Sequence, residues 1–109
     1  MIVEIKNSWW WGLAYYLICE GCALCRVDFN DDNLHGCISG LVVHPSRRKK
    51  GLGTKLIKRA EEIIKNEGFP LSWIAVEKGR TWQKAWYERL GYVVYDEDER
   101  LFYLEKTLK

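Results

Sequence analysis

The stretch HPSRRKKGLGTKLI, residues 44–57, decides how this chain folds. It follows an apolar run, passes through the basic residues 47–50, and reaches two glycines one residue apart, Gly51 and Gly53. A helix-like pattern begins directly after them. At the first turn of a helix, consecutive backbone N–H groups attract an anion, and glycine lets the backbone approach it closely. The stretch therefore predicts a phosphate-binding turn between a strand and a helix.

The residues after this turn predict two helices. From Leu52 the apolar residues recur on one face at helical spacing, and Gly68 and Pro70 end the pattern. That face comprises Leu52, Leu56, Ile57, Ala60, Ile63 and Ile64. A shorter helix begins at Thr81 and ends at Gly91. We expect its buried face to comprise Trp82, Ala85, Trp86 and Leu90.

The rest of the chain predicts strands. Glu20 and Gly21 join two of them as a hairpin, and Gly36 and Gly40 are candidate bulge sites. The expected strands are Ile2–Lys6, Leu13–Glu20, Cys22–Phe29, His35–His44, Leu71–Val76, Tyr92–Tyr95 and Leu101–Glu105. This order predicts a single domain over residues 1–109, of α/β or α+β class, with two helices on a mixed sheet.

Composition narrows the function classes. The net charge is only +2, so any preference for anions must be local to residues 47–50, and we expect neither nucleic-acid nor membrane binding. The longest apolar run, Trp9–Cys19, is shorter than the about 20 residues that span a bilayer. Glu4 is out of place in a signal peptide, so we expect a cytoplasmic protein.

Four cysteines raise the question of a metal site. Cys19, Cys22 and Cys25 are spaced like metal ligands, with Cys37 or His35 available as a fourth. On a strand, however, residues three apart point to opposite faces, which does not suit one metal ion. Cysteine also serves as a small buried residue in strands. We therefore expect no metal.

Two motifs together carry a family resemblance. Arg48, Gly51 and Gly53 fit the pattern [RQ]-x-x-G-x-[GA] after a strand. The later segment WQKAWYERLGY, residues 82–92, ends a helix with Tyr-x-x-x-Gly-aromatic. In this order the motifs resemble the GNAT superfamily of N-acetyltransferases, over roughly residues 37–105. The resemblance implies a mainly antiparallel mixed sheet whose central parallel strand pair splays apart at a coenzyme A site.

The resemblance also implies roles for individual residues. Acetyl-CoA would be the cosubstrate and a primary amine, on a small molecule or a protein, the acceptor. Tyr87 would be the general acid that protonates the departing thiolate. The pantetheine arm would pair with Leu41, Val42 and Val43. The pyrophosphate would be held by the backbone N–H groups of Arg48, Lys49, Lys50, Gly51, Leu52, Gly53 and Thr54.

Some residues depart from the family pattern. Arg80 stands where the family commonly has Asn. Ala75 stands where relatives that modify peptide N-termini often have a Glu that acts as the general base. The candidates for the general base are His35, Glu20 and Glu77, and the sequence does not select one of them. The alternative function is a non-catalytic acyl-CoA-binding or interaction module.

The segment before His35 predicts strands, where the family usually has two helices that wall the acceptor site. Trp9, Trp10 and Trp11 lie in this region. They either cover the sheet as core or form an acceptor wall or a dimer contact. An uncovered sheet favours association, so we expect a homodimer in which each subunit helps to wall the other's acceptor site.

Overall fold

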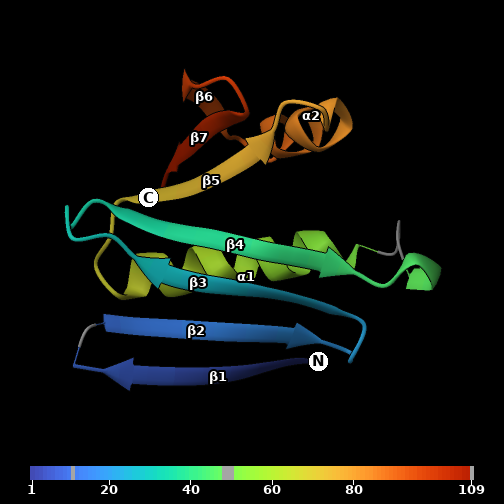
Figure 1. Cartoon of the computed structure of the whole chain (residues 1–109). Helices are drawn as coiled ribbons and strands as arrows, with labels where there is room; N and C mark the ends of the chain where they lie inside the picture. Colours follow the sequence, from blue (N-terminus) through green and yellow to red (C-terminus); the bar gives the residue numbers. More distant parts are fainter. Residues whose placement is uncertain (11, 48–50, 109) are drawn as a thin grey trace.

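A computed structural model describes residues 1–10, 12–47 and 51–108 of the chain. Figure 1 shows two groups of strands with α1 behind the first group and α2 beside the second. The elements are β1 (Ile2–Trp9), β2 (Gly12–Cys19), β3 (Ala23–Phe29), β4 (His35–Val43), the 3-10 turn η1 (Pro45–Arg47), α1 (Leu52–Asn66), β5 (Leu71–Glu77), α2 (Thr81–Arg89), β6 (Val93–Glu97) and β7 (Leu101–Thr107). Among these residues, no helix is long and apolar enough to cross a membrane.

In the described part of the chain, the strands form one seven-stranded sheet in the order β1-β2-β3-β4-β5-β7-β6. β4 and β5 are parallel neighbours, and every other neighbouring pair is antiparallel. The predicted mixed sheet with two helices is therefore confirmed. The β2–β3 hairpin turns at Glu20 and Gly21, which both have positive φ (51° and 67°).

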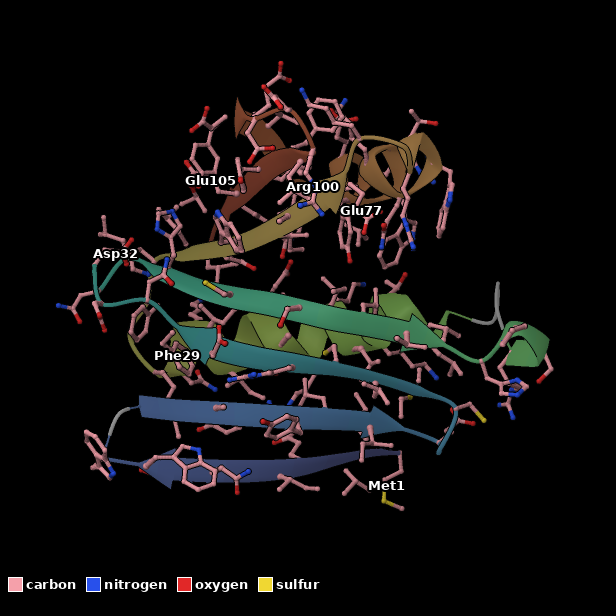
Figure 2. All side chains as sticks on the ribbon, viewed as in Figure 1. Met1, Phe29, Asp32, Glu77, Arg100 and Glu105 are labelled. Atoms are coloured by element: carbon pink, nitrogen blue, oxygen red, sulfur yellow. The ribbon has the colours of Figure 1, made fainter. Side chains whose placement is uncertain are left out.

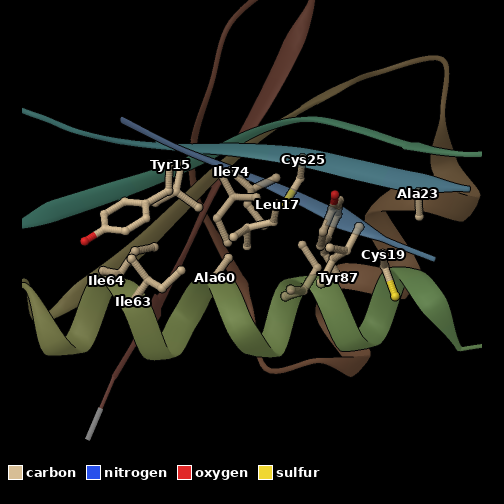
Figure 3. Packing of buried hydrophobic residues seen from close by; sticks show 14 of the residues in the cluster. Tyr15, Leu17, Cys19, Ala23, Cys25, Ala60, Ile63, Ile64, Ile74 and Tyr87 are labelled. Atoms are coloured by element: carbon tan, nitrogen blue, oxygen red, sulfur yellow. The ribbon is translucent and has the colours of Figure 1, made fainter. Parts of the chain in front are cut away.

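The core lies between the sheet and α1 (Figure 3). The predicted apolar face of α1 is buried at all its positions: Leu52, Leu56, Ile57, Ala60, Ile63 and Ile64. One face of the sheet packs against it, with side chains that include Leu17, Val27 and Ile74. The tyrosine that ends the second family motif, Tyr92, is buried below α1, where its hydroxyl donates to Glu61 (2.8 Å) and lies 2.7 Å from the Ser72 hydroxyl.

The two predicted bulge glycines have different roles. Gly40 has φ +64°, and the β3–β4 register shifts between Leu24 and Arg26, so β4 is bulged there as predicted. Gly36 pairs regularly with Phe29, so the bulge prediction is wrong at this position. A Cβ on Gly36 would lie 2.5 Å from two side-chain carbons of Ile64. Glycine is needed there because α1 crosses β4 closely.

Two aromatic predictions need correction. Trp9 ends β1 with 48% of its surface exposed and Trp10 is 92% exposed, so neither covers the sheet as core. Trp11 lies outside the described residues. In α2 the buried residue is Tyr87, whereas Trp82, expected on the buried face, is 65% exposed. The short α2 touches the core near its C-terminal end, which leaves its first turn in solvent.

Candidate active site

The site is built where the two parallel strands separate. β4 and β5 pair at His35–Leu71, Gly36–Ser72 and Cys37–Trp73, and their register ends there. Both strands nevertheless continue, to Val43 and Glu77. Figure 1 shows the two ribbons diverging toward α2 and the start of α1. The predicted splay of the central parallel pair is thus confirmed.

Two adjoining cavities lie along the separated part of β4. The smaller, of about 250 Å³, is lined by Ile38, Ser39, Gly40, Leu41, Ile74, Ala75, Glu77, Arg80, Gln83 and Tyr87. The larger, of about 630 Å³, is lined by Leu41, Val42, Val43, Arg47, Gly51, Leu52, Gly53, Thr54, Arg80, Trp82, Gln83, Trp86 and Arg89. Leu41, Arg80 and Gln83 line both. The cavities therefore adjoin along one side of β4.

The first turn of α1 forms one wall of the larger cavity. Gly51 is the N-cap residue in a left-handed conformation (φ 79°), and no side chain of the described residues caps the helix. The first N–H groups of a helix have no acceptor within it and carry partial positive charge. Gly53 lies against α2, since a Cβ there would be 3.3 Å from the Trp86 ring. An anion in this cavity would meet backbone donors directly.

Side chains add positive charge to the larger cavity. Among the described residues that line it are three arginines, Arg47, Arg80 and Arg89. Arg47 also binds Glu20 (3.0 Å), and Arg80 lies 3.6 Å from Glu77. The predicted phosphate-binding residues Arg48, Lys49 and Lys50 lie outside the described residues.

Tyr87 lines the smaller cavity with only 3% of its surface exposed. Burial raises the pKa of its phenol well above the ordinary value, the nearby Cys25 thiol acts in the same direction, and a hydrogen bond with Gln83 opposes both. The phenol is therefore protonated at neutral pH. The hydroxyl thus carries the proton that a general acid donates, while its raised pKa makes it a weaker acid than an exposed phenol.

The three candidate bases occupy different places. Glu77 lines the smaller cavity, as Tyr87 does, and its carboxylate lies 3.6 Å from Arg80. His35 lies at the paired end of β4, where its ring binds Asp32 (2.7 Å) and Glu105 (2.9 Å). Glu20 binds Arg47 beyond the other end of β4. Of the three, Glu77 is the one that lines the same cavity as Tyr87.

Several residues that line the larger cavity were not predicted as site residues. Gln83, Trp86 and Arg89 come from α2, together with Trp82. Positions 82, 86 and 89 follow helical spacing, which could have identified one cavity-facing stripe. The amphipathic interpretation instead assigned Trp82 and Trp86 to the core. Apolar spacing alone does not distinguish a core from a cavity wall.

The cysteines are free thiols, and Cys19, Cys25 and Cys37 are buried. Burial raises the pKa of Cys25 to about 12, which disfavours the thiolate needed for metal binding. Within residues 1–10, 12–47 and 51–108, no group of three or more His, Cys, Asp or Glu side chains is arranged to hold a metal ion.

The sheet that separates at its parallel pair, with a glycine-capped helix at the opening, defines an acetyltransferase-like class of fold. Residues 7–92 match the acetyltransferase (GNAT) family, and the chain belongs to this family. No curated protein matches the chain.

Several solved structures share this fold. The chain is similar to the IAA acetyltransferase of Bacillus cereus, with 15% identity, a TM-score of 0.80 and coverage of 99% of both chains. It is similar to a GNAT family acetyltransferase of Elizabethkingia anophelis with acetyl-CoA bound (16% identity, TM-score 0.76, 89% of this chain and 76% of that one). It also resembles the PaiA N-acetyltransferase of Thermoplasma acidophilum in complex with coenzyme A (21%, 0.75, 86% and 59%).

Proposed function

We propose that the protein transfers an acetyl group from acetyl-CoA to a primary amine by direct attack. The observation that carries this proposal is the pair of adjoining cavities beside β4. The larger is rich in cations and backbone donors, and the smaller holds the buried phenol of Tyr87. A long ligand with an anionic end and a reactive end fits this arrangement. The Elizabethkingia and Thermoplasma structures of the same fold are complexes with acetyl-CoA and coenzyme A, respectively.

The larger cavity is assigned to the phosphates and the pantetheine arm. The N–H groups of Gly51, Leu52, Gly53 and Thr54 would bind the pyrophosphate, and the proposal extends to those of Arg48, Lys49 and Lys50, which precede them in the sequence. Leu41, Val42 and Val43 belong to the part of β4 beyond its pairing with β5, so their backbone can pair with the arm. One of these amides would polarise the thioester carbonyl.

The chemical step is assigned to the smaller cavity. The amine nitrogen attacks the thioester carbonyl carbon, a C–N bond forms, and the C–S bond breaks. The departing thiolate takes a proton from Tyr87, and the proton lost by the amine passes to the Glu77 carboxylate. The bulged backbone at Gly40 lines the same cavity. The proposed acid, Tyr87, then comes from α2 and the proposed base, Glu77, from β5, both on one side of the opening.

The proposed acceptor is an amine on a small molecule or a protein, and the proposed active form is a homodimer. The exposed side chains of Trp9 and Trp10 support association. The cytoplasmic location stays a prediction from the sequence.

Two measurements test this function. Acetyl-CoA at about 100 times its dissociation constant should add ~2.7 kcal/mol to the free energy of unfolding. An amine panel with acetyl-CoA should release free thiol, detected with a thiol-reactive dye. Stabilisation without thiol release would favour the non-catalytic acyl-CoA-binding module, and no stabilisation would reject the cofactor assignment.

A further inference from the structure

The two edges of the sheet are protected differently. β6 is five residues long, its register with β7 shifts between Val94 and Asp96, and it carries Asp96 and Glu97. A bulge and like charges discourage another strand from pairing. β1 is eight residues long and pairs with β2 at all eight positions, from Ile2–Cys19 to Trp9–Gly12. In the described part of the chain, β1 is the last strand on its side. Its regular edge is suited to pairing.

The hydrogen-bonding groups on the outer side of β1 belong to its even-numbered residues. The Met1 carbonyl accepts from the Glu20 amide (3.2 Å), so position 1 turns its backbone groups toward β2. The direction of the backbone N–H and C=O groups alternates along a strand, so those of positions 3, 5, 7 and 9 also point toward β2. The N–H and C=O groups of Ile2, Glu4, Lys6 and Ser8 therefore point away from β2.

One face of β1 is an exposed apolar stripe. The even-numbered side chains lie on the α1 side, where Glu4 binds Arg59 (3.0 Å) and Lys6 lies over the Tyr15 ring. The odd-numbered ones lie on the other face. Their exposed fractions are 91% for Met1, 52% for Val3, 46% for Ile5 and 48% for Trp9. Figure 2 shows β1 at the rim of the sheet with the Met1 side chain directed away from it. A stripe of this kind on an open edge marks an interface.

We propose that β1 pairs antiparallel with β1 of a second copy, about a two-fold axis that passes through Ile5. This inference specifies the interface of the proposed homodimer and does not depend on acetyl transfer. Residue pairs across the axis then have numbers that add to ten. Glu4 faces the partner's Lys6, Lys6 faces the partner's Glu4, and Ile5 faces the partner's Ile5. The two sheets become one.

Charge and hydrogen bonding select this register. Hydrogen-bonded pairs must join even-numbered residues, which places the axis on one of positions 3 to 7. An axis at Glu4 or Lys6 opposes like charges, which is destabilising. An axis at Val3 or Asn7 uses only half of the outward-pointing residues. The axis at Ile5 uses all of them and opposes unlike charges, and it brings the two apolar stripes side by side on one face of the joined sheet.

This interface has a consequence for the active site. β2, β3 and β4 separate β1 from the opening beside β5. Each active site therefore lies within one copy, in contrast to the shared acceptor wall expected from the sequence.

A cysteine scan tests the register. In the non-hydrogen-bonded pair across the axis, the Cα atoms are about 4.5 Å apart, within the range of about 4.4–6.8 Å for disulfides. Ile5→Cys should therefore form a covalent dimer on mild oxidation, seen on a non-reducing gel. Val3→Cys is the matched control, because Val3 is equally exposed on the same face but faces the partner's Asn7. It should cross-link no more than wild type.

Each outcome has a clear meaning. Light scattering of the wild type at low micromolar concentration should give the mass of two chains, and Ile5→Lys should give the mass of one with its circular dichroism unchanged. A wild-type monomer would overturn both the interface and the proposed dimer. A wild-type dimer in which Ile5→Cys fails to cross-link, or cross-links no more than Val3→Cys, would overturn this interface alone.

Discussion

The two ends of the β4–β5 pair are built in opposite ways. At one end three consecutive residue pairs are in register, and His35 binds Asp32 in the preceding turn and Glu105 on β7. At the other end β4 bulges at Gly40, and two cavities take the place of strand pairing. Figure 2 labels Asp32 and Glu105 at the first end and Glu77 at the second.

This difference shows how a sheet can keep a binding site open. Unpaired backbone groups are costly when buried, so strands that lie in register normally pair along their length. Here the paired end fixes the two halves of the sheet, while the bulge and α2 keep the other end apart. The backbone groups left beside the cavity can then bind a ligand. The following predictions act on one end at a time.

The largest effect is expected at the separated end. Tyr87→Phe removes the proposed proton donor and keeps the ring, so turnover should fall roughly 10²-fold or more, with acetyl-CoA binding nearly unchanged. Steady-state kinetics and ligand-induced thermal stabilisation measure the two quantities. An unaltered rate would reduce Tyr87 to a packing residue.

Tyr92→Phe is the matched control for this variant. Tyr92 is also buried on the α1 side, but its hydroxyl binds Glu61 and Ser72 and it lines neither cavity. Loss of this hydroxyl should lower the free energy of unfolding by about 1–3 kcal/mol. The turnover of the folded enzyme should stay unchanged. Equal losses of activity in both variants would point to a general effect on the core.

The next prediction concerns the helix N-terminus at the same end. Gly51→Val places a β-branched residue at φ 79°, which should distort the turn and abolish the ~2.7 kcal/mol of stabilisation by saturating acetyl-CoA. Gly51→Asn is the control, since asparagine tolerates this conformation, and it should retain most of the stabilisation. Full stabilisation of the valine variant would reject the phosphate-binding turn.

The sequence predicted some of these features for identifiable physical reasons. The face of α1 follows from helical periodicity, because all its apolar positions meet one sheet. The separated strands and the role of Tyr87 came from the family motifs, because neither periodicity nor composition reports on missing strand pairing. The predicted central parallel pair and its open end were therefore inherited from the resemblance.

Other features could not be predicted because they depend on contacts between distant segments. Gly36 resembled a bulge glycine, but its role is set by Ile64 on α1. Trp82 resembled a core residue, but the short α2 leaves it exposed. His35 is a candidate base in the sequence, and its two carboxylate partners place it at the paired end of β4. In each case the deciding neighbour is far away in the sequence.

At the paired end, Gly36→Ala should destabilise the fold by about 2 kcal/mol, because the new Cβ overlaps the fully buried Ile64. Chemical denaturation measures the change. The control is Gly79→Ala, where a Cβ would meet no atom within 4 Å and the stability should change little. If the overlap is the cause, the double variant with Ile64→Ala should lose less than the sum of the single changes. Strict additivity would contradict the packing explanation.

The smallest effect concerns the His35 link between the two halves of the sheet. Partial burial disfavours the imidazolium, but the hydrogen bonds and charges of Asp32 and Glu105 outweigh it, so the pKa of His35 is raised above its ordinary 6.5. Because the pKa is higher in the folded state, the interactions of protonated His35 with Asp32 and Glu105 stabilise the fold fully at pH values below the ordinary pKa of 6.5. This stabilisation disappears as the pH rises through the raised value. Because both carboxylates are partly exposed, with 39% and 31% of their side-chain surface accessible, we expect less than about 1 kcal/mol. The unfolding free energies of wild type and His35→Gln, compared from about pH 5 to about pH 9, should differ most in acid and converge in alkali. A difference that does not change with pH would show that His35 holds the paired end through neutral hydrogen bonds alone.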